Sequence, residues 1–412
     1  MSESRDSGLE GLRIGYLIPE FPGQTHIWMW REIEWTRRWA EFVHIYSTRA
    51  PSDRDRARHA FAKTSQPITT TLWPGPVVGP VVWAAVTRPV GLLGAVQLCF
   101  TLPIDKRPAA LELLKLVPSA CYLSKEVVRN KLNHVHSHSC ASSAVLAMMV
   151  RRITGVPFSL TLNANVEWWG GAMAEKFKDA KFTLAITEWL LDQCKKSFPE
   201  LAPDQLLLGR IGVDTTSWPA KQECEPLQGR PARLLTVARL HSSKGHDDLI
   251  RALGLLVAQG RDIQLRMVGD GPQRAELEEQ VNSSGLKSRV TFTGSLAEDQ
   301  IKDEMRQADV FALASHAEPL GVVYMEAMAS GVPTVGTNAG GVGEIITSGE
   351  DGLLVEPKNP KALADAIAHI LDNPDVWKKL ALNGRRTIVE RFDSRIGAAT
   401  LFRRATGRDP KN

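Results

Sequence analysis

Two glutamates stand eight positions apart in the stretch HAEPLGVVYMEAMASGVP, residues 316–333, which is otherwise largely apolar or small. A buried carboxylate is costly unless a partner compensates its charge. Glu318 and Glu326 could therefore be held there to bind something that offers hydroxyl groups at two separated points. The alternative is that Glu318 caps a helix and Glu326 lies on its surface.

The residues between the two glutamates favour an anion site. The spacing predicts a helix here, whose first free N–H groups belong to Leu320, Gly321 and Val322. Such groups, with the positive end of the helix behind them, bind phosphates, and Gly321 lets a diphosphate approach the backbone. We expect a nucleotide diphosphate sugar with its ribose at Glu326, its diphosphate at the helix start and its sugar at Glu318.

The rest of the chain predicts where this stretch lies. Short apolar runs alternate with longer amphipathic segments, the pattern of parallel sheets covered by helices. Ligands of such folds bind beyond the carboxyl ends of the strands, where residues 316–321 follow an apolar run. Strands are expected at residues 12–19, 42–47, 134–138, 158–162, 182–187, 207–214, 233–239, 263–269, 290–294, 310–315, 334–337 and 352–357.

This alternation is broken once, which predicts an α/β protein of two Rossmann-like, doubly wound domains with a cleft between them. The first domain is expected at residues 1–214 and the second, which holds the two glutamates, at residues 215–392. A further helix within residues 393–412 could cross back and join the first domain.

Composition is that of a soluble globular protein, with 412 residues, 43% of them hydrophobic and 23% charged. The net charge of +4 is too small to indicate nucleic acid, although residues 1–215 carry +5. That excess suits an acidic ligand, an anionic membrane face or a merely solvated surface. Five scattered cysteines without a CxxC motif favour a reducing cytosol over disulfides or zinc, and the polar start lacks the apolar core of a signal peptide.

Residues 72–102 are long and apolar, but Arg88 and Pro89 interrupt them. Since no uninterrupted apolar run of about 18 residues exists, a helix that spans a bilayer is not expected. The segment predicts a pair of short helices. Core packing and peripheral contact with a membrane, such as the inner face of the plasma membrane, both fit this composition.

The stretch EPLGVVYME resembles the signature of the family 4 glycosyltransferases, which is Glu, seven residues, Glu. The continuation AMASGVPTVGTNAGGVGEII, with DGLLVEP and ALADAIAHIL, extends the resemblance over the second domain. The resemblance implies a GT-B fold and metal-independent sugar transfer from a nucleotide sugar, with retention at the anomeric carbon. The segment IPEFPGQTHIWMWREI, residues 18–33, is similar to family members that act in exopolysaccharide or colanic-acid assembly.

The family's donor site can be carried over residue by residue. VARLHSSKGHDDLI resembles the segment whose arginine and lysine clamp the diphosphate, here Arg239 and Lys244. Two fixed cations would stabilise the charge on a leaving diphosphate, as a metal would otherwise. Gly271 in VGDGP resembles a strand-end loop of the family, and Gly294 fits a loop near the base. The Asp-x-Asp at residues 53–55 lies among basic residues, so no metal site is expected.

In the first domain the resemblance assigns Gly23, Gln24 and Thr25 to a loop that touches the donor phosphate or the acceptor. His138 in HVHSHS matches the family's His-x-His strand and points either into the cleft, as a catalytic group, or into the core. Asn163 stands where the family usually has a histidine near the transferred sugar. An amide can bind a sugar hydroxyl but cannot take a proton near pH 7.

Ten of the eleven tryptophans precede residue 219, and sugars stack on aromatic rings. Trp168 and Trp169 follow the strand that ends before Asn163, so they are either acceptor contacts or ordinary loop residues. The helical spacing of Trp28, Trp35 and Trp39 favours a place in the core.

These residues predict a hexosyltransferase of surface polysaccharide or glycolipid synthesis, with a UDP- or GDP-linked donor, a glycan or lipid-linked acceptor and no resident cofactor. Two other readings stay open. One is a different two-Rossmann enzyme, such as a nucleotide-sugar epimerase or a phosphorylase. The other, motivated by Asn163, is a catalytically weak or inactive protein that binds nucleotide sugars without turnover.

Overall fold

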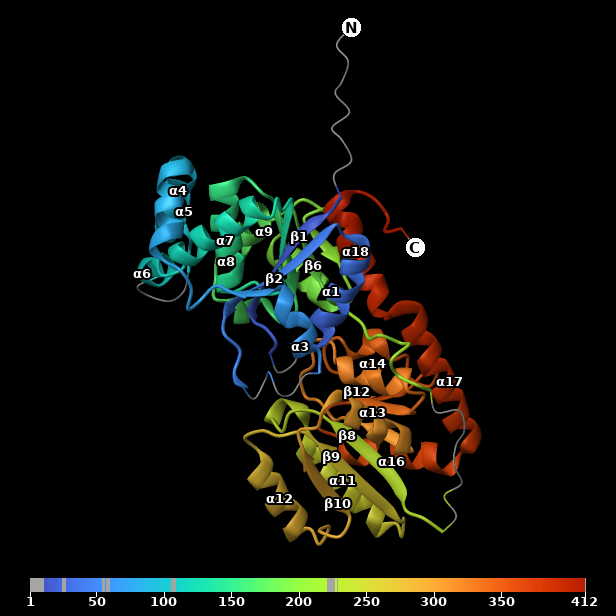
Figure 1. Ribbon diagram of the computed structural model, residues 1–412. Coiled ribbons are helices and arrows are strands. Elements are labelled where there is room, and N and C mark those ends of the chain that lie inside the picture. The colour runs from blue at the N-terminus through green and yellow to red at the C-terminus, as the bar shows by residue number, and fades with distance from the viewer. Residues whose placement is uncertain are drawn as a thin grey trace.

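The computed structural model describes residues 11–23, 27–53, 56, 60–104, 109–220, 227 and 229–411. Within these residues two parallel sheets are present, each with helices packed on it (Figure 1). The expected α/β architecture of two Rossmann-like domains is confirmed.

The described part of the first domain holds a seven-stranded sheet in the order β3-β2-β1-β4-β5-β6-β7, with every neighbouring pair parallel. Its central strands are buried on both faces and are mostly apolar in sequence. Buried polar side chains among them hydrogen-bond to one another, as His136 does with Thr161. The strands are β1 (Arg13–Glu20), β2 (Phe42–Arg49), β3 (Thr69–Thr71), β4 (His134–Ser137), β5 (Phe158–Leu162), β6 (Phe182–Ala185) and β7 (Leu206–Leu208).

Helices cover both faces of this sheet, with α7 and α8 on one side and α1 on the other (Figure 1). They are α1 (Ile27–Trp39), α3 (Phe61–Ser65), α4 (Val78–Thr87), α5 (Pro89–Thr101), α6 (Ala109–Leu114), α7 (Val117–Arg129), α8 (Ser142–Thr154), α9 (Met173–Asp179) and α10 (Glu188–Ser197), with short 3-10 helices η1 (Gln66–Ile68) and η2 (Val166–Trp169).

The second sheet, again within the described residues, has six parallel strands in the order β10-β9-β8-β11-β12-β13. Its strands are β8 (Ala232–Val237), β9 (Ile263–Val268), β10 (Val290–Gly294), β11 (Val310–Ala312), β12 (Thr334–Thr337) and β13 (Leu353–Val355). Its helices are η3 (Ser242–Lys244), α11 (His246–Ala258), α12 (Arg274–Ser283), α13 (Glu298–Gln307), α14 (Val322–Ala329), α15 (Val342–Ile345), α16 (Pro360–Asp372) and α17 (Pro374–Arg391).

The C-terminal helix α18 (Ser394–Thr406) leaves the second domain and lies beside α1 of the first (Figure 1). The indole Nε1 of Trp35 donates to Oγ of Ser394 at 3.2 Å, and the rings of Trp39 and Phe402 meet edge to face at 5.9 Å. Trp35 and Trp39 therefore serve the contact between α1 and the returning helix.

A second contact joins the domains at the start of α10. The two oxygens of Glu344, in α15, accept hydrogen bonds from the backbone N–H groups of Glu188 and Trp189, both at 2.8 Å. These N–H groups belong to the first turn of α10, where a helix has no partners of its own. A carboxylate of the second domain thus completes a helix of the first.

Among the described residues, no single helix is long and apolar enough to cross a bilayer. The pair α4 and α5 is apolar enough when taken together, but the two helices bend by 116° where they meet.

Candidate active site

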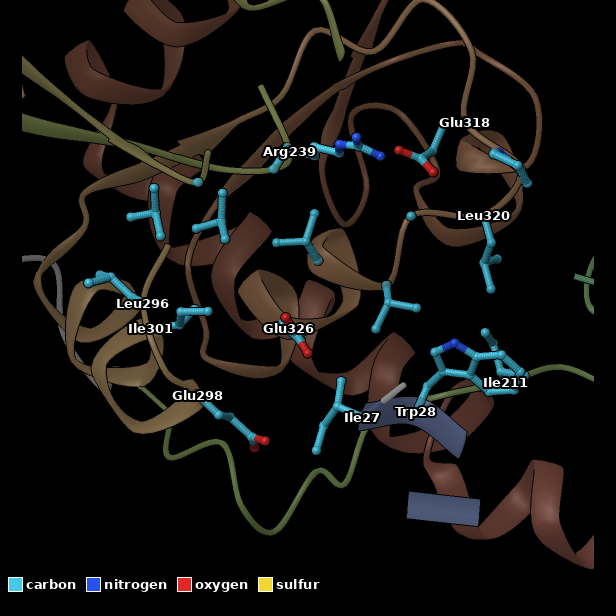
Figure 2. A pocket seen from close by; sticks show the side chains of 18 of the residues that line it. Ile27, Trp28, Ile211, Arg239, Leu296, Glu298, Ile301, Glu318, Leu320 and Glu326 are labelled. Atoms are coloured by element: carbon cyan, nitrogen blue, oxygen red, sulfur yellow. The ribbon is translucent and has the colours of Figure 1, made fainter. Parts of the chain in front are cut away.

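A cavity of about 630 Å³ lies between the two domains, and Figure 2 shows the side chains around it. The second domain lines it with residues at the carboxyl ends of its strands and with the start of α14. The first domain contributes Ile27 and Trp28 of α1, together with Asn163, Ile186 and Ile211. The cavity is therefore where a parallel sheet of this kind would bind a ligand.

Glu318 lines one end of this cavity and is only 8% exposed. Its Oε2 lies 2.5 Å from Nζ of Lys244 and accepts a hydrogen bond from Oγ of Ser315 at 3.3 Å. Figure 2 shows the guanidinium of Arg239 pointing toward the same carboxylate. Two cations thus lie at Glu318: Arg239 lines the cavity, whereas Lys244 is not among its described lining and reaches the site through its contact with Glu318.

Two glycines fix the backbone that carries Glu318. The N–H of Gly341 donates to the carbonyl of Glu318 at 3.0 Å. Gly340 has a φ of 60°, and a side chain there would collide with the same carbonyl oxygen. At position 340 only glycine combines a positive φ with the absence of a side chain, so this turn holds the Glu318 loop in place without strain.

Helix α14 begins at the cavity. Its N-cap, Gly321, has a φ of 89°, and a Cβ built there would lie 2.5 Å from the ring of Tyr324. The hydroxyl of Tyr324 donates to the carbonyl of Leu313, which ties the helix start to the end of β11. Leu320, Gly321 and Val322 all line the cavity, and the positive end of the helix faces it.

Glu326 lies farther along α14, on its cavity side, with a side chain 12% exposed. Its Oε1 is 3.0 Å from Nη2 of Arg31, a residue of α1 in the other domain, and the same Nη2 is 3.5 Å from Glu298. Burial raises the pKa of Glu326, and the nearby Arg31 cation opposes that rise. Figure 2 shows Glu326 and Glu298 on neighbouring walls of the cavity.

Two of the three predicted donor-site glycines, Gly271 and Gly294, lie near the cavity but not in its described lining. Gly271 packs against the backbone of Leu240, whereas its neighbour Gly269 lines the cavity. The carbonyl of Gly294 accepts from the N–H of Gly269 at 2.9 Å, and the next residue, Ser295, is a lining residue. Both glycines therefore shape loops whose adjacent residues face the cavity.

Asn163 lines the cavity from the first domain, where its Nδ2 donates to the carbonyl of His138 at 3.2 Å. The His138 side chain itself is fully buried, with Nε2 at 3.2 Å from Oε1 of Glu32. Its ring stacks on Tyr16 at 5.4 Å and meets the edge of Trp28 at 5.0 Å. Because Trp28 lines the cavity, the structure places His138 one layer behind the wall, in the core.

The remaining predicted residues are not among the cavity's described lining. Gly23 is buried, while Gln24 and Thr25 lie outside the described residues. Trp168 is 69% exposed, and the Nε1 of Trp169 donates to the carbonyl of Ala164 at 3.1 Å. Their roles as acceptor contacts stay predictions.

One buried cluster has the geometry to hold a cation. Ligand atoms of Glu32, His136 and His138 lie within 4.8 Å of one another. However, Nδ1 of His136 is 2.7 Å from Oγ of Ser159 and its Nε2 is 2.9 Å from Oγ1 of Thr161. Burial lowers the pKa of His136 well below its usual value. Both nitrogens of His136 are thus already engaged by hydroxyl groups of the core, so this histidine does not need a cation as a partner.

Sequence reasoning missed several residues that the structure brings to the cavity: Arg31, Ser295, Leu296, Glu298 and Ile301. Arg31 belongs to the Trp-rich helix α1. The spacing of residues along that helix does not predict a contact with Glu326 in the other domain. Glu298 stands in the acidic first turn of α13, where a charge near the helix N-terminus already accounts for it.

Comparison with known proteins agrees with this arrangement. Residues 219–387 match the family described as glycosyl transferases group 1. Glycogen synthase of Mycobacterium tuberculosis is 30% identical over 273 residues, which cover 63% of this chain and 65% of that protein. A GDP-mannose-dependent phosphatidylinositol monomannoside mannosyltransferase of Mycolicibacterium smegmatis is 30% identical over 206 residues, 48% of this chain and 54% of that protein. The chain thus spans less than two thirds of these relatives.

Solved structures extend the likeness to the whole fold. A glycosyltransferase of Rickettsia africae superposes with a TM-score of 0.71 at 16% identity, over 96% of this chain and 98% of that one. The Anabaena protein HepE, in complex with UDP, superposes with a TM-score of 0.72 at 18% identity, over 95% and 98%. The expected GT-B fold is confirmed.

Proposed function

We propose that this chain, whose residues 219–387 belong to the group 1 glycosyltransferases, transfers a sugar from a nucleotide diphosphate sugar to a glycan or lipid-linked acceptor. The observation that carries the proposal is that Glu318 and Glu326 line one interdomain cavity, with the N-terminus of α14 between them. We propose that the enzyme acts in the synthesis of a surface polysaccharide or glycolipid, on the cytoplasmic side of the membrane, where nucleotide sugars are made.

The donor would lie along α14. Its ribose hydroxyls would donate to Glu326, and its diphosphate would meet the N–H groups of Leu320, Gly321 and Val322. Arg239 and Lys244 would hold the far phosphate, with the sugar at Glu318. Since Lys244 is already 2.5 Å from Glu318, one ammonium group would serve both the carboxylate and the departing phosphate.

The chemistry follows from these charges. As the bond from the anomeric carbon to phosphate breaks, negative charge builds on the diphosphate and positive charge on the sugar ring. The negative charge on the diphosphate would be stabilised by Arg239, Lys244 and the helix end. The positive charge on the sugar ring would be stabilised by Glu318, so the proposed mechanism requires no metal or other cofactor. In a front-face reaction with retention, the acceptor hydroxyl passes its proton to the departing phosphate oxygen as it bonds to the anomeric carbon.

UDP and GDP are the donor nucleotides we propose to test first. HepE, which shares the fold, is known in complex with UDP and with UDP-glucose, and the mycobacterial mannosyltransferase is named for GDP-mannose. The carboxylate of Glu326 would bind the ribose of either nucleotide.

A second candidate function rests on Asn163. This amide lines the cavity where the family usually has a histidine, so the chain could bind a nucleotide sugar without turning it over. Front-face transfer, in which the leaving group takes the proton, needs no base there. Release of free nucleotide diphosphate from the sugar donor, with or without an acceptor, separates a transferase from a binding protein.

The test is a thermal-shift panel of UDP, GDP and ADP with and without EDTA, on wild type and on Glu326→Ala. One nucleotide should raise Tm in EDTA, and Glu326→Ala should lose that shift. Glu279→Ala, which removes an exposed carboxylate from α12 of the same domain, is the matched control and should behave as wild type. A shift that requires a divalent metal, or that survives in Glu326→Ala, would contradict the proposed site.

A further inference from the structure

Helices α4 and α5 carry an apolar surface that the fold does not use. They lie at the outer edge of the first domain, away from the second domain (Figure 1). Their inner residues, which include Ala84, Ala95 and Leu98, are buried, where α4 packs on α7 and α5 on α8. The pair is therefore anchored on one side only.

The outer face of α4 is a row of valines. Val78, Val82 and Val86 are spaced by four residues, so they share one face of the helix, and they are 75%, 55% and 75% exposed. These valines contribute little to the stability of the fold, because apolar side chains stabilise a protein only when they are removed from water.

Helix α5 also carries exposed apolar side chains. Val90, Leu93 and Phe100 are 81%, 69% and 67% exposed, and their spacing places them on one side of the helix. Trp73, just before α4, is 55% exposed. Exposed apolar side chains that gather on one helix pair mark an interaction site rather than scattered surface residues.

Charge on the helix pair itself has one sign. Arg88 is the single charged residue within residues 78–101, which span both helices. Arg88 is exposed at the bend, between the two apolar rows. Exposed apolar side chains beside a cation, with no acidic residue on either helix, match a bilayer whose headgroups are negative.

We propose that the outer face of α4 and α5, together with Trp73, docks on the surface of an anionic lipid bilayer. The valines, Leu93 and Phe100 enter the boundary between headgroups and acyl chains, while Arg88 pairs with lipid phosphates. The bend of 116° suits a helix pair that lies in the interface and does not cross it. This docking does not depend on the proposed donor site, which lies in the cleft between the domains.

The experiment is flotation of the full chain with vesicles of phosphatidylcholine alone or with phosphatidylglycerol. Wild type should float with the anionic vesicles and much less with the neutral ones. The double variant Val86→Glu/Val90→Glu should lose at least about tenfold in partitioning, since it places two charges on the docking face. Arg88→Gln should lose about fivefold on anionic vesicles.

The matched control is Leu382→Glu/Val389→Glu, which charges two apolar residues of α17 that are 61% and 44% exposed. It should float as wild type does. Equal flotation of the α4–α5 variant and wild type would overturn the proposal. A dimer of the wild type, detected by light scattering and absent from the α4–α5 variant, would also overturn the proposal. In that case a second copy of the chain would cover this face. A nucleotide thermal shift on each variant, expected to match wild type, separates failure of docking from failure of the donor site.

Discussion

Nη2 of Arg31 lies 3.0 Å from Oε1 of Glu326, so a cation of the first domain reaches the carboxylate that we assign to the donor ribose in the second. Arg31 is 4% exposed and also lies 3.5 Å from Glu298. A buried cation that contacts two carboxylates partly offsets the cost of their burial and joins the domains at the cavity wall. Burial raises the pKa of Glu326, and this residue from the other domain opposes the rise.

Removing this cation should move the pH dependence of nucleotide binding. Burial raises the pKa of Glu326 and Arg31 lowers it, so Arg31→Ala should raise that pKa further. A protonated Glu326 is a poorer acceptor for ribose hydroxyls, and nucleotide affinity should therefore fall at a higher pH in the variant than in wild type. Kd measured by calorimetry between pH 5 and pH 8 checks this, with Arg37→Ala on the same helix as control. Identical pH profiles would contradict it.

Lys244 should act on phosphate and not on the nucleoside. Loss of one charge-assisted contact costs about 1.5–3 kcal/mol, so Lys244→Ala should weaken binding of the nucleoside diphosphate by about 10- to 100-fold. The corresponding nucleoside, which has no phosphate, should lose little affinity. Lys287→Ala, which removes an exposed lysine of the same domain, should change neither. Equal losses for both ligands would show that Lys244 acts through the fold.

Asn163 should contribute no ionisation step to the pH dependence of kcat. Its amide cannot titrate near pH 7, so the wild-type kcat should show no protonation step from this position. Asn163→His should add a step near the ordinary histidine pKa of about 6.5, while Asn163→Ala should lower kcat by about tenfold through loss of a sugar contact. The pH profile of kcat for the three proteins is the measurement. A profile of Asn163→His that matches wild type would place residue 163 away from the reacting atoms.

The buried histidines should make the protein sensitive to acid. Burial lowers the pKa of His134 to about 3 and those of His44 and His246 to about 4, and it lowers that of His136 as well. These groups stay neutral in the folded chain but take up protons in the unfolded chain below about pH 6.5. Their contribution to stability is therefore present above pH 6.5 and is lost as pH falls toward 4.

Each such proton adds about 1.4 kcal/mol per pH unit to the slope of the unfolding free energy. His44→Gln can keep the hydrogen bond to Thr70 and should reduce that slope by about this amount between pH 6 and pH 4.5. The exposed His369 offers the control, as His369→Gln should leave the slope unchanged. Urea unfolding at a series of pH values would show the difference, and equal slopes for the two variants would refute the argument.

Alternation of apolar runs predicted most of the fold. Each of the twelve expected strands overlaps an observed one, since strands buried on both faces are mostly apolar. The missed strand, β3, is the three threonines Thr69–Thr71 at the edge of the first sheet. Only one neighbour pairs with it, so it needs no apolar run. The last expected strand of the first domain was too long, because β7 ends at Leu208 and the chain then leaves the sheet.

The donor side of the site could be predicted because its residues are close in sequence. Glu318, Leu320, Gly321, Val322 and Glu326 occupy one loop and helix, and all line the cavity. Arg31 could not be found in this way, since its contact joins residues 295 positions apart in different domains. The burial of His138 behind Trp28 likewise depends on how α1 crosses the sheet, and strand spacing does not determine that.

Glu344 gives the interdomain contact a measurable consequence. Its carboxylate accepts hydrogen bonds from the amides of Glu188 and Trp189, at a helix end that belongs to the opposite domain. A widening of the cleft that separates Glu344 from α10 would expose those two amide protons to solvent. Deuterium uptake at the backbone amides of Glu188 and Trp189 would therefore report domain opening.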